Sequence, residues 1–136
     1  MEYRIIEKTI KIKAPLKKVW AVFTNPDITK QMGGYYDTDW KIGSSFGFKT
    51  VNGNRLTNGT ILEYQPERLI KHNLFEPNSE KVMAVITYDF QEKDGDTLLT
   101  GNEELTRPLD KTAFKDASEG WGFALNTIKE LAESLQ

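Results

Sequence analysis

The order of sequence patterns along the chain constrains its fold most. An alternating strand over residues 3–13 ends at Ala14-Pro15, and a short helix is predicted over residues 16–23. Asn25 can cap a second short helix that opens at Pro26. Only strand and turn sequence follows until one long amphipathic helix closes the chain. This order predicts an α+β protein in which a sheet wraps around the last helix.

The middle of the chain is predicted to be a meander of strands. Gly, Asn, Asp and Pro separate its apolar segments, and strands joined by short turns are antiparallel neighbours. Asn58-Gly59 indicates a bulge or an offset turn inside one strand, and residues 35–42 are ambiguous. The predicted strands cover residues 45–51, 56–64, 69–75, 82–90 and 97–106.

The final helix carries apolar residues at spacings of three and four, which is typical of a helix with one buried face. Gly120 and Gly122 are unfavourable in a helix, by roughly 1 kcal/mol each relative to alanine. A local irregularity, or a helix that begins later near Ser118, is the favoured interpretation. The alternative is a close approach of the backbone to a neighbour, or a bend over a cavity. The apolar positions are Phe114, Ala117, Trp121, Leu125, Ile128, Leu131 or Ala132, and Leu135.

Length and composition indicate a single domain over residues 1–136. A net charge of −2 gives no electrostatic reason to expect a nucleic-acid partner. The absence of cysteine excludes disulfides and thiol chemistry. No signal-peptide pattern and no apolar run of membrane-spanning length is present, so we expect a cytoplasmic protein without membrane insertion. Lys11 and Lys13 alternate with isoleucines and are predicted to lie on the solvent side of their strand.

Two titratable residues lie on strand faces that also carry apolar residues. His72 shares a strand face with Ile70 and Leu74, and Glu103 shares one with Leu99. A lone inward histidine is usually a hydrogen-bonded core residue, although it can serve as a general base. For Glu103 the favoured interpretation is that it reaches solvent near the sheet edge, because a buried carboxylate needs partners. The sequence does not show whether the two side chains meet.

The apolar faces of the strands and of the last helix are predicted to line a ligand cavity. They must cover one another, because no other segment of the chain can do so. Tyr35, Tyr36 and Trp40 could form an exposed aromatic lip or anchor the core. We predict no catalytic residue, no metal site and no cofactor. The predicted ligand-binding residues are Phe46, Phe48, His72, Ile86, Tyr88, Leu99, Glu103, Trp121, Leu125 and Ile128.

Short motifs in a fixed order give the chain a family resemblance. It resembles the family named after the activator of the ninety-kilodalton heat-shock chaperone's ATPase, within the helix-grip superfamily of START domains, polyketide cyclases and birch-pollen-type allergens. The resemblance implies a curved antiparallel sheet gripping the last helix, with a hydrophobic cavity between them. The matching motifs are Ile12-Lys13-Ala14-Pro15 with Val19-Trp20, Thr24-Asn25-Pro26, residues 39–46 around Gly43, residues 59–63, Pro66-Glu67-Arg68-Leu69, Gly95-Asp96-Thr97 and Gly120-Trp121.

Three functions remain open at the level of sequence. The first is a module that binds or senses a hydrophobic or amphipathic small molecule in an internal cavity. The second, implied by the resemblance, is an interaction module for a heat-shock chaperone, with the basic first strand and residues 35–40 as candidate surfaces. The third is a cyclase- or hydrolase-type enzyme in which His72 and Glu103 transfer protons.

Overall fold

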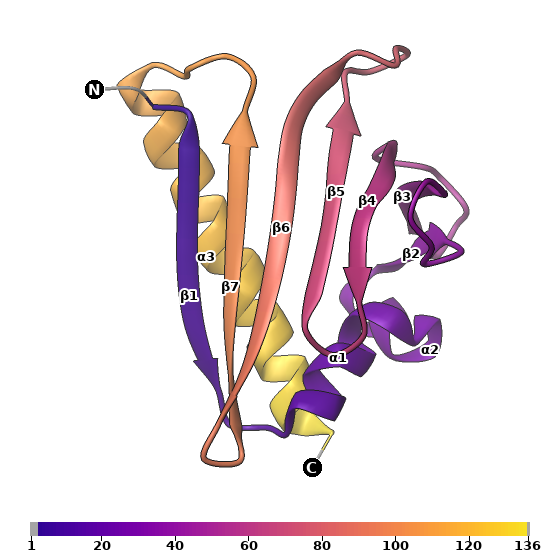
Figure 1. Cartoon of the computed structure of the whole chain (residues 1–136), viewed down its shortest axis with the longest axis vertical. Coiled ribbons are helices and arrows are strands. Elements are labelled where there is room, and N and C mark those ends of the chain that lie inside the picture. The colour runs from indigo at the N-terminus through magenta and orange to yellow at the C-terminus, as the bar shows by residue number, and fades with distance from the viewer. Residues whose placement is uncertain (1–2, 136) are drawn as a thin grey trace.

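The computed structural model of the chain describes residues 3–135 and consists of one curved sheet with helices on its concave side (Figure 1). The long last helix runs diagonally behind the strands, and the two short helices lie near its end. The helical elements are α1 (Leu16–Thr24), α2 (Pro26–Thr29), the 3-10 turn η1 (Lys30–Met32) and α3 (Lys111–Ser134). The strands are β1 (Ile5–Ile12), β2 (Gly34–Thr38), β3 (Ser45–Thr50), β4 (Gly59–Gln65), β5 (Leu69–Phe75), β6 (Val82–Lys93) and β7 (Asp96–Leu105).

The sheet has seven strands in the order β1-β7-β6-β5-β4-β3-β2, and every neighbouring pair is antiparallel. The first and last strands of the sequence are therefore partners, while the rest form the predicted meander. Strand β3 pairs with β4 through two residues only, so the sheet turns sharply between its two parts. The predicted helix-grip architecture is confirmed.

The two short helices begin where the sequence indicated. Helix α1 starts at Leu16, directly after Pro15, whose extended conformation ends the preceding segment. The side chain of Asn25 accepts a hydrogen bond from the Asp27 backbone N–H at 3.1 Å, which confirms its role as the cap of α2. Gly33, with φ of 99°, ends η1 and turns the chain into β2.

Strand β4 begins at Gly59, not at Leu56 as predicted. Backbone pairing with β3 is present at Arg55 and Leu56, where the Leu56 N–H donates to the Phe48 carbonyl at 2.8 Å. It is interrupted at Thr57, because the Phe48 backbone N–H donates to Thr57 Oγ1 at 2.9 Å. Arg55 also folds back onto Asp37, with 2.7 Å between Nη2 and Oδ2. The bulge indicated by Asn58-Gly59 lies further on, where the register of β4 on β5 shifts between Ile61 and Glu63.

Helix α3 is continuous from Lys111, so the late start near Ser118, one of the two favoured interpretations, was wrong. Asp110 caps the helix, accepting a hydrogen bond from the Ala113 backbone N–H at 2.8 Å. Such a cap stabilises a helix by about 1 kcal/mol. Burial of the apolar residues in the later turns stabilises it by far more than the two glycines destabilise it. A Cβ added at Gly120 or Gly122 would meet nothing within 4 Å, so neither glycine marks a close backbone approach.

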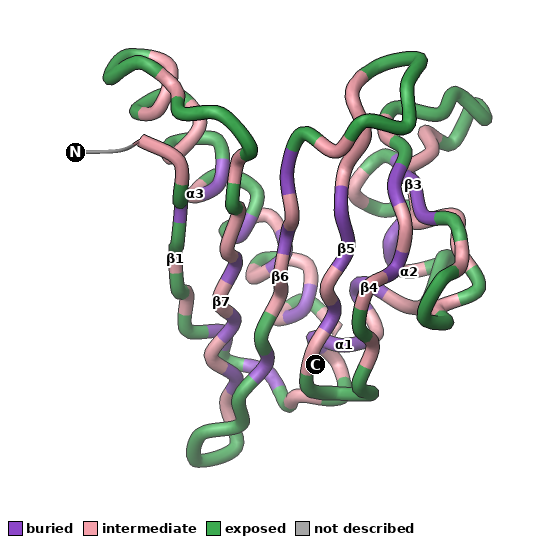
Figure 2. Tube along the Cα trace, turned by 45° about the horizontal axis from the view of Figure 1, so that its top comes forward, coloured by how far each residue is buried: buried purple, intermediate pink, exposed green. Residues whose placement is uncertain are grey.

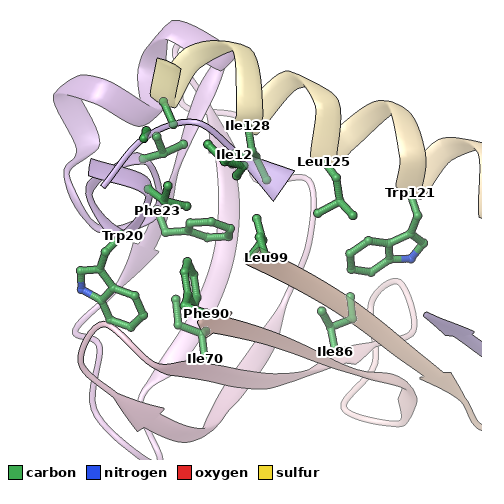
Figure 3. Packing of buried hydrophobic residues seen from close by; sticks show 14 of the residues in the cluster. Ile12, Trp20, Phe23, Ile70, Ile86, Phe90, Leu99, Trp121, Leu125 and Ile128 are labelled. Atoms are coloured by element: carbon green, nitrogen blue, oxygen red, sulfur yellow. The ribbon is translucent and has the colours of Figure 1, made fainter. Parts of the chain in front are cut away.

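The core lies between α3, α1 and the concave face of the sheet (Figure 3). Leu125 and Ile128 of α3 point toward Leu99 of β7, and Trp20 and Phe23 of α1 lie beside Phe90 of β6. Buried residues are concentrated in the middle of the strands, while the connecting loops are exposed (Figure 2). Lys11 and Lys13 are exposed, as predicted for the solvent side of the first strand.

Trp121 rests directly on Gly101, and this contact sets the distance between helix and sheet. A Cβ added at Gly101 would overlap the indole ring of Trp121, so no larger residue fits at this position of β7. The indole therefore fits against β7 because this strand has no side chain at position 101.

We expect Gly101→Ala to lower the free energy of unfolding by about 1–3 kcal/mol, because the added methyl group must displace the indole. Gly120→Ala is the matched control, since it adds the same group in open space inside a helix and should stabilise the fold by roughly 0.5–1 kcal/mol. Urea unfolding of both variants measures the two effects. Equal effects of the two substitutions would show that the contact of Trp121 with Gly101 does not limit packing.

Candidate functional site

His72, Ile86 and Glu103 form a row across three neighbouring strands on the concave face. His72 of β5 pairs with Ile86 of β6, which in turn pairs with Glu103 of β7. Since neighbouring strands lie about 4.8 Å apart, the backbones of His72 and Glu103 are about 10 Å apart, with Ile86 between them. The two titratable side chains therefore share one face, but they do not form an acid–base pair.

The concave face opens into an aromatic hollow beside this row, between β2, β3 and the centre of the sheet. Its volume is about 220 Å³. Tyr36 of β2 stacks on Phe46 and meets the edge of Phe48, at ring distances of 5.3 and 5.2 Å, which builds one wall. The aromatic hollow is lined by Tyr36, Phe46, Phe48, Leu56, Thr57, His72, Leu74, Ile86 and Tyr88.

His72 presents a neutral ring to this hollow. The side chain is 3% exposed, and its ring stacks on Phe46 at a centroid distance of 4.0 Å. Burial lowers the pKa of His72 to about 4, against the smaller opposite effect of its hydrogen bond to the Asn73 carbonyl. Because a carbonyl only accepts, Nδ1 carries the proton and donates at 2.9 Å. Nε2 is then an acceptor, and it has no hydrogen-bond partner within residues 3–135.

Tyr36 and Tyr88 place two hydroxyl groups in the same apolar surroundings. Burial raises the pKa of Tyr36 to about 12, and a hydrogen bond from the Tyr88 hydroxyl opposes this shift. The pKa of Tyr88 is raised well above its usual value, first by burial and then by the neighbouring Tyr36 and the charge of Glu103. Both phenols therefore remain protonated and offer polar groups without charge.

A second, helix-side hollow of about 340 Å³ lies between the sheet and the first half of α3. Leu74, Ile86 and Tyr88 line both hollows, so the two hollows share one wall. The helix contributes only small residues beside Trp121, which leaves space that larger side chains would fill. The helix-side hollow is lined by Leu74, Ile86, Tyr88, Glu103, Ala117, Gly120, Trp121 and Ala124.

Glu103 is held in the helix-side hollow by Trp121. The indole Nε1–H of Trp121 donates to Glu103 Oε1 at 2.8 Å. The ring of Tyr88 lies 5.7 Å from that of Trp121, so two aromatic rings neighbour the carboxylate. Glu103 lines a hollow and bonds to the helix, so the structure supports the inward alternative over the favoured interpretation of a side chain that reaches solvent at the sheet edge.

The structure places seven of the ten predicted ligand-binding residues at the two hollows. Phe46, Phe48 and His72 line the aromatic hollow, Glu103 and Trp121 line the helix-side hollow, and Ile86 and Tyr88 line both. The other three predicted residues, Leu99, Leu125 and Ile128, are at most 5% exposed in the packed core and line neither hollow (Figure 3). Their alternation and helical spacing indicated an inward position, which is right, but could not distinguish core from cavity.

The sequence prediction missed Tyr36 and Leu74 as lining residues. Leu74 shares the two-residue alternation of His72, so a signal for it was present. Tyr36 lies opposite Phe48 in the register of β2 on β3, and β2 was not predicted. Tyr36 and Trp40 pack against the core cluster, and Trp40 contacts Tyr64 at a ring distance of 5.6 Å, so they anchor the interior.

A third hollow, on the outer face of the sheet, differs in chemistry. Its volume of about 440 Å³ is the largest of the three, but its walls are short polar side chains of β1, β6 and β7 that face solvent. Glu7 and Asn102 already bond to each other there, at 3.1 Å. Within residues 3–135, no group of three or more acidic or histidine side chains is arranged to hold a metal, and no helix is long and apolar enough to cross a membrane.

Comparison with known proteins identifies the relatives of this fold. A family model described as Activator of Hsp90 ATPase homolog 1-like protein matches residues 13–133. No curated protein matches the chain.

Solved structures share the architecture at low sequence identity. Protein MLL2253 from Mesorhizobium loti superposes with a TM-score of 0.79 at 18% identity, over 98% of this chain and 99% of that chain. ChR145 from Cytophaga hutchinsonii gives 0.79 at 22% identity, over 98% and 97% of the two chains. DynU16, a protein in the dynemicin biosynthetic locus, gives 0.77 at 17% identity, over 97% of this chain and 47% of that chain.

We expect stability to fall in mild acid because of His72. Its pKa is about 4 in the folded chain, against an ordinary value of 6.5 that applies to the unfolded chain, so protonation favours unfolding. The contribution of neutral His72 to the free energy of unfolding is complete above the pKa of the unfolded chain and is lost as the pH falls toward the pKa of the folded chain. The loss is about 2 kcal/mol between about pH 7 and about pH 5. Urea unfolding across this range measures it. His72→Gln should flatten the dependence, and an equally steep loss in that variant would assign it to other groups.

Proposed function

We propose, from the premise that the chain belongs to the family of Activator of Hsp90 ATPase homolog 1-like proteins, that it binds an apolar or amphipathic small molecule between the sheet and α3. The observation that carries the proposal is the aromatic hollow with the neutral, unpartnered Nε2 of His72 in its wall. Apolar walls with a few oriented polar groups are typical of small-molecule sites. Because the chain has no cysteine, we place this function in the cytoplasm.

The polar groups of the hollow suit recognition of a ligand hydroxyl. Nε2 of His72 can accept a hydrogen bond, the Tyr36 hydroxyl can donate one, and the Tyr88 hydroxyl, which already donates to Tyr36, can accept one. All three side chains are uncharged near neutral pH, since burial lowers the pKa of His72 and raises those of both tyrosines. A planar ligand carrying a hydroxyl group would stack on the aromatic walls and satisfy Nε2.

The other two candidate functions have less support. A chaperone interaction rests on the family description, and of its two candidate surfaces, residues 35–40 use Tyr36 and Trp40 to anchor the core. The enzyme hypothesis needs His72 and Glu103 to act together, but Ile86 lies between them in the strand register. Each of the two bonds to a different neighbour, the Asn73 carbonyl or the Trp121 indole.

We expect naphthol to bind the wild-type protein and to shift the amide NMR signals of β3, β5 and β6 around Phe48, His72 and Tyr88. Leu74→Phe should weaken binding by about tenfold or more, because the larger side chain fills the wall that both hollows share. Amide NMR titration measures both affinities, and the dispersion of the spectrum shows that the variant is folded.

Leu98→Phe serves as the control, since Leu98 lies on the opposite face of β7, two residues along from Thr100 of the outer hollow. It should leave naphthol binding unchanged. Shifts confined to the outer face, or equal affinity in the Leu74 and Leu98 variants, would contradict a site on the concave side.

A further inference from the structure

We propose that the helix-side hollow selects apolar ligands whose polar group is a cationic amine, with Glu103 as the group that recognises it, and that it rejects carboxylates. This inference rests on the proposed function and names its ligand class. It follows from three features of the hollow: the free oxygen of Glu103, the aromatic rings beside it, and the charges of the lining.

Glu103 has capacity for a further hydrogen bond. Its Oε1 accepts from the indole N–H of Trp121 at 2.8 Å, and this is its one hydrogen bond within the described part of the chain. Oε2 therefore has no partner among residues 3–135, and the other walls of the hollow are largely apolar. A donor on a ligand would satisfy it, and a charged donor would form the stronger bond.

The rings next to Glu103 also favour a cation. The ring centroids of Tyr88 and Trp121 are 5.7 Å apart, and both residues line the helix-side hollow. The faces of such rings attract ammonium groups, and the attraction is greater where water is partly excluded. An amine held by Glu103 would therefore have these two rings as neighbours.

No cation of the lining opposes this selection. Among the eight residues that line the helix-side hollow, Glu103 is the one charged residue. Lys8 of β1 pairs with Gly101, so it is diagonal to Glu103 on the same face, but no ion pair within 4 Å joins the two. A ligand carboxylate in the hollow would meet the like charge of Glu103, whereas an amine would meet the opposite charge.

The negative charge of Glu103 can be removed by substitution while its hydrogen bond to Trp121 of α3 is kept. A glutamine at position 103 keeps an oxygen that can accept from the Trp121 indole, but it loses the negative charge. Glu104 is exposed on the opposite face of β7, so Glu104→Gln changes the net charge equally and leaves the hollow untouched. The pair separates the local charge of Glu103 from the overall charge of the protein.

The test is isothermal titration of the wild type, Glu103→Gln and Glu104→Gln with three naphthalenes that carry an aminomethyl, a hydroxymethyl or a carboxylate group. We expect the wild type to bind the amine most tightly and the carboxylate most weakly. Glu103→Gln should weaken amine binding by about tenfold or more and reduce the difference between amine and carboxylate. Glu104→Gln should match the wild type, and urea unfolding confirms that both variants are folded.

The outcomes distinguish this inference from the proposed function. If the alcohol binds but the amine has no advantage, or if Glu103→Gln keeps the preference for the amine, the inference is wrong and the proposed function stands. If none of the three compounds binds, both are wrong.

Discussion

The contact between Trp121 and the sheet is the interaction on which the rest of the concave side depends. The indole rests on Gly101, where β7 offers no side chain, and its N–H is fixed by Glu103. From this point to its C-terminal end, α3 buries Leu125, Ile128 and Ala132 in the core. Before it, no residue of α3 between Lys111 and Gly120 is buried. The tryptophan therefore divides the helix into a packed half and a half that leaves space over the sheet.

That division explains why the same helix contributes to both a core and a hollow. Dry packing of large apolar side chains stabilises the C-terminal half, since each fully buried residue of this kind contributes about 1.5–3 kcal/mol. Before Trp121 and one turn after it, the helix borders the hollow with Ala117, Gly120 and Ala124, which are too small to fill the space over the sheet. Phe114 holds the start of the helix by its contact with Tyr3, at a ring distance of 5.1 Å. The helix is thus held by Phe114 at its start and by Trp121 near its middle. The hollow between helix and sheet exists because the other lining residues of α3 are small.

Sequence reasoning predicted the elements well where one physical signal dominated. Alternation located β5 to the residue and gave the inward face of His72, because a buried face fixes the register of a strand. It did not predict β2, whose polar-aromatic residues show no clear alternation. It also placed the start of β4 too early, because a side-chain bond of Thr57 to the Phe48 backbone N–H interrupts the pairing with β3. It could not separate Leu99 and Leu125 from the lining residues, because inward direction is local whereas the size of the gap depends on residues far away in sequence, such as Gly101 and Trp121.

The two polar sites of the concave face differ in charge, and this difference limits what the molecule can do there. At the aromatic hollow, burial keeps His72 neutral, so that end accepts hydrogen bonds without favouring either sign of charge. At the helix-side hollow, Glu103 supplies a negative charge that reaches Tyr88, whose pKa it helps to raise after the larger effect of burial. Because Ile86 lies between the two residues, they cannot exchange a proton directly, but a single elongated ligand could touch both. The arrangement therefore favours recognition of a ligand with two different ends over acid–base chemistry at one point.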